Sequence, residues 1–243
     1  MEKMRTQIGL DGATTVASIV KGPVSNAALE RGSRQRAFNA ARLFTLKRVI
    51  DLLVATILLV ALLPICLVIA ALVGLGGGPV FFKHTRIGRG GAEFPCFKFR
   101  TMITNGDEVL KAVLAGDPAA RREWEVDHKL RNDPRITPIG RFLRKSSLDE
   151  LPQLLNVIRG DMSLVGPRPV VKNELELYSR AAKRYVAVRP GITGLWQVMG
   201  RNNTSYARRV ALDSYYVSNV SPKLDAVILL KTIRVVLTRH GAY

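Results

Sequence analysis

The sequence predicts a mainly helical α+β protein that associates with a membrane. The first observation is an apolar segment, residues 52–75, which contains no charged residue. The second is a pair of strand-like runs, residues 80–86 and 94–101, separated by a GRGG turn. The third is residues 224–240, where apolar residues recur at helical spacing and most Lys and Arg lie off the apolar stripe. Together they predict a β-hairpin among helices, several of them amphipathic and able to lie in a membrane interface.

The chain is strongly basic and also rich in hydrophobic residues. Its formal net charge is +18, and 47% of its 243 residues are hydrophobic. A charge of this size indicates an anionic partner: nucleic acid, an anionic membrane surface or a phosphorylated substrate. The hydrophobic content excludes a wholly disordered chain. The two cysteines, Cys66 and Cys96, are too few for a disulfide framework.

The pattern divides the chain into three parts. Residues 1–45 show no sustained period and predict a basic arm without regular structure. Residues 46–78 hold the apolar segment, and residues 79–243 form the folded remainder. Within that remainder, residues 107–130 follow a helical pattern that is interrupted at the sequence GDPAA.

The apolar segment allows two membrane arrangements. As a straight helix it would span roughly 36 Å, against about 30 Å for the hydrocarbon core. Pro64 stands at its centre, and a proline inside a helix kinks or breaks it. Residues 31–50 carry six Lys or Arg and residues 79–100 carry five, so the positive-inside rule gives no orientation. A kinked spanning helix and a re-entrant hairpin with both flanks on one side remain equally open.

Two adjacent carboxylates, Asp149 and Glu150, stand out in so basic a chain. One interpretation is a capping box, in which Ser147 caps a helix and Glu150 reaches back to it. Pro152 would then fall in the first turn, where proline is tolerated, and the acids would complement the helix dipole. On this stretch alone, the capping box is the favoured interpretation.

The surrounding arginines support a second interpretation, phosphoryl transfer. A carboxylate held among arginines stays ionised and is therefore nucleophilic. The same arginines would neutralise a diphosphate, and a second carboxylate could hold Mg²⁺ against phosphate oxygens. Such a site relies on positioning and electrostatics. The basic residues near the pair are Arg131, Arg135, Arg141, Arg144, Lys145, Arg159 and Arg168.

Four motifs in order resemble a known family. They are KFRTM, LRKSSLDELPQLLNVIRGDMSLVGPRP, RPGITGLWQVMGR and the terminal GAY. Together they are similar to the bacterial sugar transferases, monotopic phosphoglycosyl transferases that start the assembly of exopolysaccharides and related glycans. The resemblance extends from about residue 47 to residue 243, which leaves out only the arm. It is nearest to the compact members that lack additional N-terminal membrane helices.

The resemblance implies a reaction. Hexose-1-phosphate would pass from a UDP-hexose, with galactose and glucose as the foremost candidates, to undecaprenyl phosphate. The products would be UMP and undecaprenyl-diphosphate-hexose, in the first membrane step of exopolysaccharide biosynthesis. Mg²⁺ would be the cofactor. The protein would also contact membrane lipids, and it would not bind nucleic acid. A homodimer is compatible with the resemblance.

The resemblance also assigns roles to residues. Asp149 would be the nucleophile that forms a phosphosugar–aspartyl intermediate. Glu150 would be the second catalytic residue, which holds Mg²⁺ and assists the second displacement. Contacts to phosphate or nucleotide would come from Lys98, Arg144, Arg168 and Arg189. The family has an acid near the C-terminus, for which Asp225 matches best and Asp213 is the other option. The three histidines, His84, His128 and His240, share no ligand-like spacing and receive no role.

The same resemblance implies a membrane topology. Residues 46–78 would form a re-entrant helix–break–helix, broken at Pro64. The family often breaks at Ser-Pro, whereas Leu63 precedes the proline here. Residues 79–243 would be the catalytic domain on the cytoplasmic face of the bacterial inner membrane, because a UDP-sugar is cytosolic.

Two other function classes compete with the transferase. A membrane-anchored nucleic-acid-binding protein would also be basic, but no helix-turn-helix, RNP or zinc signature is visible. A non-catalytic membrane scaffold would keep the apolar segment and the amphipathic tail. It would not need adjacent carboxylates among arginines, so substitution of Asp149 separates it from an enzyme.

Overall fold

The computed structural model describes residues 26–127, 130–200 and 204–238. The chain divides into two compact units, Met1–Leu46 and Lys47–Tyr243. The described residues are mainly helical and include two small sheets, which confirms the predicted mainly helical class.

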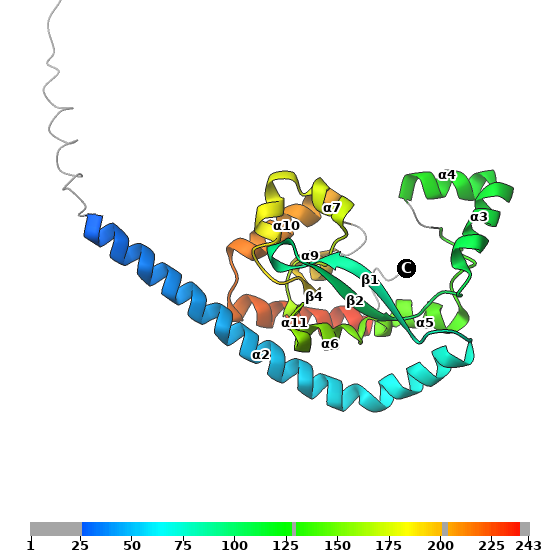
Figure 1. The fold of residues 1–243 in the computed structure, drawn as a ribbon, viewed down its shortest axis with the longest axis horizontal. Coiled ribbons are helices and arrows are strands. Elements are labelled where there is room, and N and C mark those ends of the chain that lie inside the picture. Colours follow the sequence, from blue (N-terminus) through cyan, green and yellow to red (C-terminus); the bar gives the residue numbers. More distant parts are fainter. Residues whose placement is uncertain (1–25, 128–129, 201–203, 239–243) are drawn as a thin grey trace, which may run out of the picture. The chain divides into compact units, whose positions relative to one another are not determined.

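The elements follow one another without repetition of a motif (Figure 1). One sheet pairs β1 with β2 antiparallel, and the other pairs the short strands β3 and β4 parallel. The bounds are α2 (Asn26–Leu75), β1 (Phe81–Ile87), η1 (Arg89–Gly91), β2 (Glu93–Phe99), α3 (Gly106–Gly116), α4 (Pro118–Asp127), α5 (Pro138–Ser146), η2 (Leu148–Glu150), α6 (Gln153–Arg159), β3 (Ser163–Val165), α7 (Lys172–Leu177), η3 (Ser179–Ala181), α8 (Ala182–Tyr185), β4 (Gly191–Thr193), α9 (Leu195–Met199), α10 (Tyr206–Ser218) and α11 (Pro222–Thr238).

The described part of the first unit differs from the expected arm. We predicted no regular structure in residues 1–45, whereas α2 already begins at Asn26. The stretch 26–46 contains no proline and is rich in Ala, Leu and Arg, which favour helix, so the apolar helix extends upstream through it. Residues 1–25 lie outside the described residues.

The apolar segment is one helix rather than two. α2 is continuous through Pro64, so the predicted break is not confirmed, and the helix bends in the cyan part of the ribbon (Figure 1). An interior proline costs one backbone hydrogen bond and bends the helix, and neighbouring helical bonds can hold the rest. The stretch Leu43–Leu75 is long and apolar enough to cross a membrane, and only 11% of its most apolar window is buried.

The predicted hairpin is confirmed. β1 and β2 pair in a register that places Phe82 opposite Lys98. The turn contains η1, in which Gly90 has a φ of 72° and Gly91 a φ of 81°. Because only glycine adopts these angles without strain, the GRGG sequence fixes where the two strands meet.

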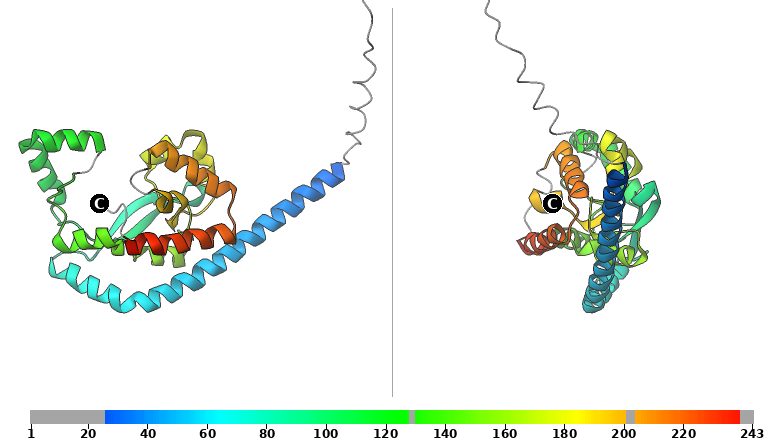
Figure 2. Two further views of the ribbon diagram at one scale, coloured as in Figure 1. Left: turned by 180° about the vertical axis from the view of Figure 1, so that it is seen from behind. Right: turned by 90° about the vertical axis from the view of Figure 1, so that its left-hand side faces the viewer.

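The main core of the second unit lies between α2, α6, β3, α10 and α11. Leu154, Val157, Met162, Tyr216 and Ile228 are buried there, and the partly buried flanks of α2 pack against them. Figures 1 and 2 show the later part of α2 on one side of α6 and α11, with α7 and α10 on the opposite side. The core therefore joins the apolar helix to the folded domain.

The beginning of this unit is bound to that core by polar contacts. Arg48 Nη1 donates to Val157 O at 2.6 Å, where α6 ends. Asp51 is buried and accepts from Ser163 Oγ at 2.7 Å and from Leu164 N at 3.1 Å. A buried carboxylate that accepts two hydrogen bonds holds the helix firmly against β3.

The far end of the apolar segment contacts the same domain. Ile69 and Val73 are buried in a second cluster with Phe99 of β2 and Leu143 of α5. Arg100 Nη2 also donates to Val73 O at 2.8 Å. Both ends of the segment after residue 47 therefore contact one folded domain, and the exposed middle lies between them.

Candidate active site

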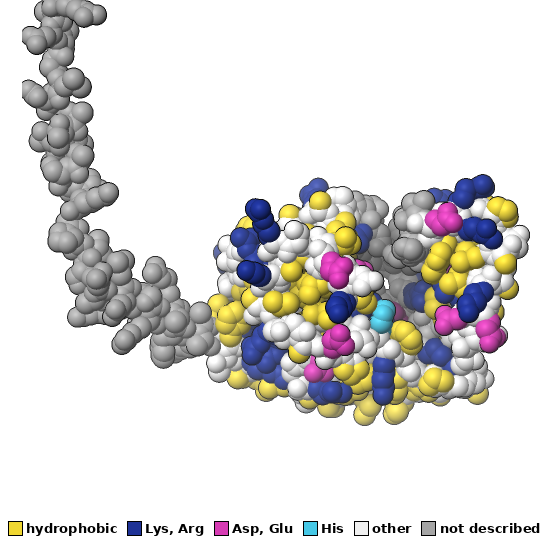
Figure 3. Space-filling view, turned by 45° about the horizontal axis from the view of Figure 1, so that its top comes forward, with side chains coloured by type: hydrophobic (Ala, Val, Ile, Leu, Met, Phe, Trp, Pro, Cys, Tyr) yellow, Lys and Arg dark blue, Asp and Glu magenta, His cyan; other side chains and the backbone are white. Residues whose placement is uncertain are grey.

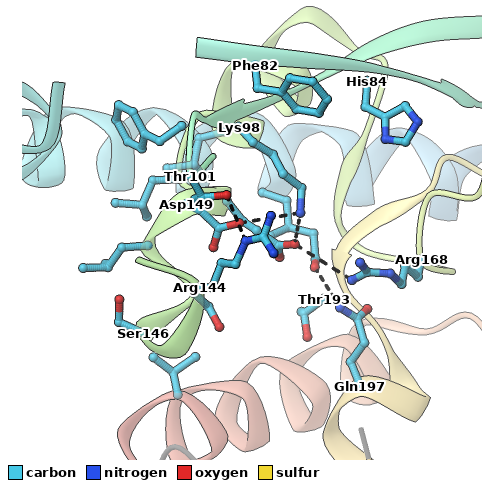
Figure 4. Close-up of a pocket in the computed structure, with 18 of the residues that line it drawn as sticks. Phe82, His84, Lys98, Thr101, Arg144, Ser146, Asp149, Arg168, Thr193 and Gln197 are labelled. Atoms are coloured by element: carbon cyan, nitrogen blue, oxygen red, sulfur yellow. Dashed lines mark hydrogen bonds and ion pairs between the residues drawn. The ribbon is translucent and has the colours of Figure 1, made fainter. Parts of the chain in front are cut away.

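A cavity of about 1240 Å³ opens in the second unit. Its polar wall comes from β1, β2, α5 and η2 and includes Asp149 and Glu150. Its apolar wall comes from α2 and α11 and includes Leu58, Leu62 and Ile233. The surface is hollowed beside the lobe of α3 and α4 (Figure 3), and charged side chains converge at the centre of the cavity (Figure 4). One cavity thus joins a charged centre to an aliphatic surface.

The carboxylate pair lies on η2, a single tight turn between α5 and α6. The turn starts at Ser147, whose φ of 60° is left-handed and ends α5. The predicted capping box is wrong, because the Ser147 side chain makes no cap hydrogen bond and α6 begins only at Gln153. Pro152 has no N–H to donate and suits the position just before a helix. The two acids are therefore left on the turn that faces the cavity.

Lys98 from β2 approaches both carboxylates. Its Nζ lies 2.6 Å from Glu150 Oε1 and 3.8 Å from Asp149 Oδ2. Arg168 enters from the other side, with Nη1 3.9 Å from Glu150 Oε1. Figure 4 shows Lys98, Asp149 and Arg168 reaching the centre of the cavity from separate elements. The structure thus brings together residues that are 52 positions apart in the chain.

Arg144 is the third predicted basic residue that lines the cavity, after Lys98 and Arg168. Its Nε donates to Thr101 Oγ1 at 2.9 Å, which fixes the guanidinium beside the turn (Figure 4). Burial lowers the pKa of Arg144, whereas the charges of Asp149 and Asp133 raise it. Asp133 itself is bound by Arg135 through two short contacts, at 2.8 and 2.6 Å.

The environment of Asp149 corrects one expectation. Burial raises the pKa of Asp149 above its usual value, and the charge of Glu150 raises it further. Lys98 and Arg144 lower it, but they do not outweigh burial. The sequence suggested that nearby cations keep Asp149 ionised, but burial has the larger effect on its pKa. A partly desolvated carboxylate is also a stronger nucleophile once it is ionised.

Two glycine-containing loops place Arg168. Gly166 N donates to Thr193 O at 3.0 Å, and Gly191 N donates to Pro167 O at 2.8 Å. A Cβ on Gly191 would lie 2.1 Å from Gly166 N, so the two backbones approach too closely for a side chain. The loops of the GPRP and RPGITG motifs therefore pack directly against each other, a contact that the sequence did not reveal.

Arg189 lies away from the cavity, although the sequence suggested a nucleotide contact. Its Nε donates to Gly160 O at 2.7 Å, at the end of α6. Burial lowers the pKa of Arg189, and the charges of Arg89 and Arg48 lower it further. Arg189 does not line the cavity, and its contacts are those of a residue that caps α6.

Neither candidate C-terminal acid lines the cavity. Asp225 pairs with Lys47 at 2.7 Å and accepts from Tyr216 Oη at 2.8 Å, so it binds α11 to the start of the second unit. Asp213 accepts from Tyr178 Oη at 2.8 Å, and burial raises its pKa to about 7 while the Arg168 charge lowers it. Asp213 is thus the acid whose charge interacts with the site.

Sequence reasoning missed the residues of β1 that line the cavity. His84 received no role, yet it lines the cavity with Phe82 and Arg86. The signal was present, because alternate residues of a strand share a face, and Lys98 lies opposite Phe82. His128, His240 and the terminal GAY lie outside the described residues.

Comparison with known proteins gives consistent matches. The chain is 54% identical over 198 residues to exopolysaccharide production protein ExoY of Sinorhizobium fredii, with 81% of this chain and 88% of that protein covered. It is 54% identical to the undecaprenyl-phosphate galactose phosphotransferase of Salmonella typhimurium, covering 82% of this chain and 42% of that protein. It is 41% identical to the UDP-glucose:undecaprenyl-phosphate glucose-1-phosphate transferase of Caulobacter vibrioides, with 81% and 72% covered.

The charged centre, the paired glycine loops and the apolar segment 52–75 all lie within residues 42–239. The chain spans about two fifths of the length of the Salmonella relative. Residues 42–239 match the sequence profile named bacterial sugar transferase. This chain belongs to the bacterial sugar transferase family.

Proposed function

We propose that the protein transfers hexose-1-phosphate from a UDP-hexose, galactose or glucose, to undecaprenyl phosphate. One observation carries the proposal. A buried carboxylate, Asp149, lies in a cavity with three basic side chains, and the same cavity continues along aliphatic side chains of α2 and α11. The charged part suits a diphosphate, and the aliphatic part suits a polyprenyl chain. The basic residues are Lys98, Arg144 and Arg168.

The reaction proceeds in two displacements. A carboxylate oxygen of Asp149 attacks the phosphorus that bears the hexose, and the bond from this phosphorus to the bridging oxygen of UMP breaks. UMP leaves with the bonding pair. An oxygen of undecaprenyl phosphate then attacks the phosphosugar–aspartyl intermediate, which releases Asp149 and forms the new diphosphate. One diphosphate replaces another, so neither ATP nor a redox partner is required.

The basic residues stabilise the charge that moves during these steps. Lys98 and Arg168 approach the pair from opposite sides, so they can hold the non-bridging oxygens of the diphosphate. Arg144 is fixed by Thr101 and faces Asp149, where it favours the ionised nucleophile. The raised pKa of Asp149 means that the reaction gains rate as the pH rises and this carboxyl loses its proton.

The two carboxylates fit a magnesium ion shared with the substrate. Mg²⁺ usually binds one or two carboxylates together with phosphate oxygens. Asp149 and Glu150 supply that set, whereas the described residues contain no group of three acids, histidines or cysteines suited to a metal. Glu150 would be the ligand, and bound Mg²⁺ would neutralise diphosphate charge. The contact of Lys98 with Glu150 keeps this carboxylate turned toward the phosphates.

The proposed placement in the membrane is re-entrant, with the domain on the cytoplasmic face. Both ends of the apolar segment after residue 47 contact one folded domain, and a folded domain lies on one side of a membrane. A straight span would separate those ends. The bend of α2 lets the exposed middle enter the bilayer and return, with one continuous helix in place of two.

Release of UMP tests the reaction. Purified protein with undecaprenyl phosphate, Mg²⁺ and either UDP-galactose or UDP-glucose should release UMP. Asp149→Asn should abolish release, and rapid quenching of the wild type without acceptor should trap hexose phosphate on the protein. Glu108→Gln, on the exposed face of α3, is the matched control and should keep full activity. Full turnover by Asp149→Asn would refute the nucleophile, and a wild type without turnover would favour the scaffold.

Cysteine labelling tests the topology. Ala40→Cys and Arg89→Cys, each in a Cys66→Ala, Cys96→Ala background, place single thiols on the two sides of the apolar segment. A membrane-impermeant maleimide should label both in inside-out vesicles and neither in intact spheroplasts. Labelling of the two thiols from opposite sides would establish a spanning helix instead.

A further inference from the structure

Three side chains of β1 form a row along the cavity. Phe82, His84 and Arg86 alternate along the strand, so they share one face, and all three line the cavity with Lys98 of β2. On the other face of the strand, Phe81 stacks on Phe99 with ring centroids 5.4 Å apart, so it is turned away from this row. Figure 4 shows Phe82 and His84 directed from the strand toward the charged centre.

Phe82 presents an aromatic face to the cavity. Its side chain is 51% exposed, although it is apolar and stands beside charged residues. Its ring meets the His84 ring edge-on, at a centroid distance of 5.9 Å and an angle of 60°. The flat face of Phe82 is therefore available for stacking, with an imidazole at its border.

His84 presents a hydrogen-bond donor beside that face. Its Nδ1 lies 3.2 Å from Arg86 Nη2, and a guanidinium can only donate, so Nδ1 accepts. Burial lowers the pKa of His84, the charges of Arg86 and Lys98 lower it further, and Glu174 opposes them. The ring is therefore neutral at pH 7, with its single hydrogen on Nε2.

We propose that Phe82 and His84 bind the nucleobase of the sugar-nucleotide donor. The base stacks on Phe82, and His84 Nε2 donates a hydrogen bond to a carbonyl oxygen at the edge of a pyrimidine. The inference rests on the proposed function and adds to it the residues that recognise the base. Lys98, opposite Phe82 on β2, then lies where the diphosphate begins.

The chemistry of the row favours a base over the other parts of the substrates. A base has both a planar π face and carbonyl acceptors in its plane. A hexose lacks the planar π face, and a prenyl chain lacks an acceptor for the imidazole N–H. The aliphatic residues that suit a prenyl chain come from α2 and α11 instead.

Calorimetric binding of UMP is the first test, with ribose 5-phosphate as the probe that lacks a base. Phe82→Ala should weaken UMP binding about tenfold, because stacking of a base on an aromatic ring contributes on that scale. Ribose 5-phosphate should bind the wild type and this variant equally. Phe82→Tyr keeps the aromatic ring and should keep the affinity, whereas Phe82→Leu keeps only the apolar volume and should lose it.

His84 has its own matched pair of variants. His84→Ala removes the donor and should weaken UMP binding several-fold. His84→Gln places an amide N–H nearby and should restore much of the affinity. In turnover, Phe82→Ala should raise the KM for the donor by about the factor seen with UMP, with kcat and the KM for undecaprenyl phosphate unchanged. Thermal unfolding should be unaltered, since Phe82 is exposed.

Three results would overturn the inference. One is equal UMP affinity in Phe82→Ala and the wild type. A second is a changed preference between UDP-galactose and UDP-glucose with unchanged UMP binding, which would place the hexose on the row. The third is weaker vesicle binding or a raised KM for undecaprenyl phosphate alone, which would assign Phe82 to the membrane. A wild type that releases no UMP defeats the proposed function, whereas normal turnover by all Phe82 and His84 variants defeats only this inference.

Discussion

Two clusters of the same residue types lie in the second unit and differ in how their charges are used. The charged centre consists of Lys98, Arg144, Asp149, Glu150 and Arg168, and it faces the cavity. The anchor cluster consists of Lys47, Arg48, Asp51, Arg189 and Asp225, and it binds the start of the unit to α6, β3 and α11. Both combine acids with Lys and Arg, and both belong to stretches that the family resemblance marks.

The contacts separate the two clusters. In the anchor cluster, side chains bond to backbone groups at 2.6–3.1 Å, as in Arg48 to Val157 O and Leu164 N to Asp51. In the charged centre, Lys98 Nζ lies 2.6 Å from Glu150 Oε1 but 3.8 Å from Asp149 Oδ2, and Arg168 Nη1 lies 3.9 Å from Glu150 Oε1; none of these contacts is to the backbone. Close contacts with the backbone stabilise the fold, whereas charged side chains that face a cavity without backbone partners can still bind the charges of a substrate. Charge alone therefore does not identify a functional residue.

The largest expected effect is on kcat, and it distinguishes one arginine of the charged centre from one arginine of the anchor cluster when both are replaced by Gln. Arg168→Gln should lower kcat about 100-fold, because a charge that stabilises the diphosphate is lost, with little change in stability. Arg189→Gln should keep kcat and lower the free energy of unfolding by about 1 kcal/mol, through the lost bond to Gly160 O. UMP release and thermal unfolding of both variants check this. A loss of kcat in Arg189→Gln as large as that in Arg168→Gln would erase the distinction.

Asp51 tests the anchor cluster directly. Asp51→Asn removes the negative charge that accepts from the Ser163 hydroxyl and the Leu164 N–H, so two charge-assisted hydrogen bonds weaken, and the Ser163 hydroxyl keeps only Val165 O as acceptor. We expect the free energy of unfolding to fall by about 1–3 kcal/mol, with kcat per folded molecule unchanged. Thermal unfolding in detergent measures the loss, with Glu125→Gln on the exposed face of α4 as control. An equal stability of the two variants would contradict the anchoring role of Asp51.

Local patterns in the sequence predicted much of the fold. The glycines of GRGG fix the hairpin turn, and alternation fixes its strands. The interruption at GDPAA separates α3 from α4, as expected from Asp117 and Pro118. The start of α6 was misplaced, since a left-handed Ser147 imitates a helix cap in sequence but ends the preceding helix.

Long-range contacts account for what the sequence could not predict in the site. The motif resemblance named Asp149, Lys98 and Arg168, which all line the cavity, and also Arg189, which does not line it and bonds to the end of α6. The presence of a residue in a motif does not show whether its side chain contacts a substrate or a backbone carbonyl of the protein. The pairing of Gly166 with Gly191 joins two distant loops and has no local signal. The raised pKa of Asp149 depends on burial, which single-residue patterns do not report.

A smaller effect concerns the pH profile of the charged centre. The charge of Lys98 lowers the pKa of Asp149, against the burial that raises it. Lys98→Met should therefore raise this pKa further, so the ionised nucleophile appears only at higher pH. The acid limb of the profile of kcat/KM against pH should move to higher pH, whatever the fall in its maximum. Lys83→Met, on the other face of β1, is the control, and an unmoved limb in Lys98→Met would contradict this account.

The smallest expected effect concerns Asp213, which lies behind the charged centre. Its folded-state pKa is raised to about 7 from an ordinary value of 3.8. A group with a raised pKa contributes stability that is complete below pH 4 and is lost as the pH rises through 7. Asp213→Asn cannot ionise and can still accept from Tyr178 Oη, so its stability should not follow that decline. The Tm of Asp213→Asn relative to the wild type should therefore rise between pH 5 and pH 8, by about 5 °C. A Tm difference that is the same at both pH values would show that Asp213 titrates alike in the folded and unfolded chain, and that its burial beside Arg168 does not control its charge.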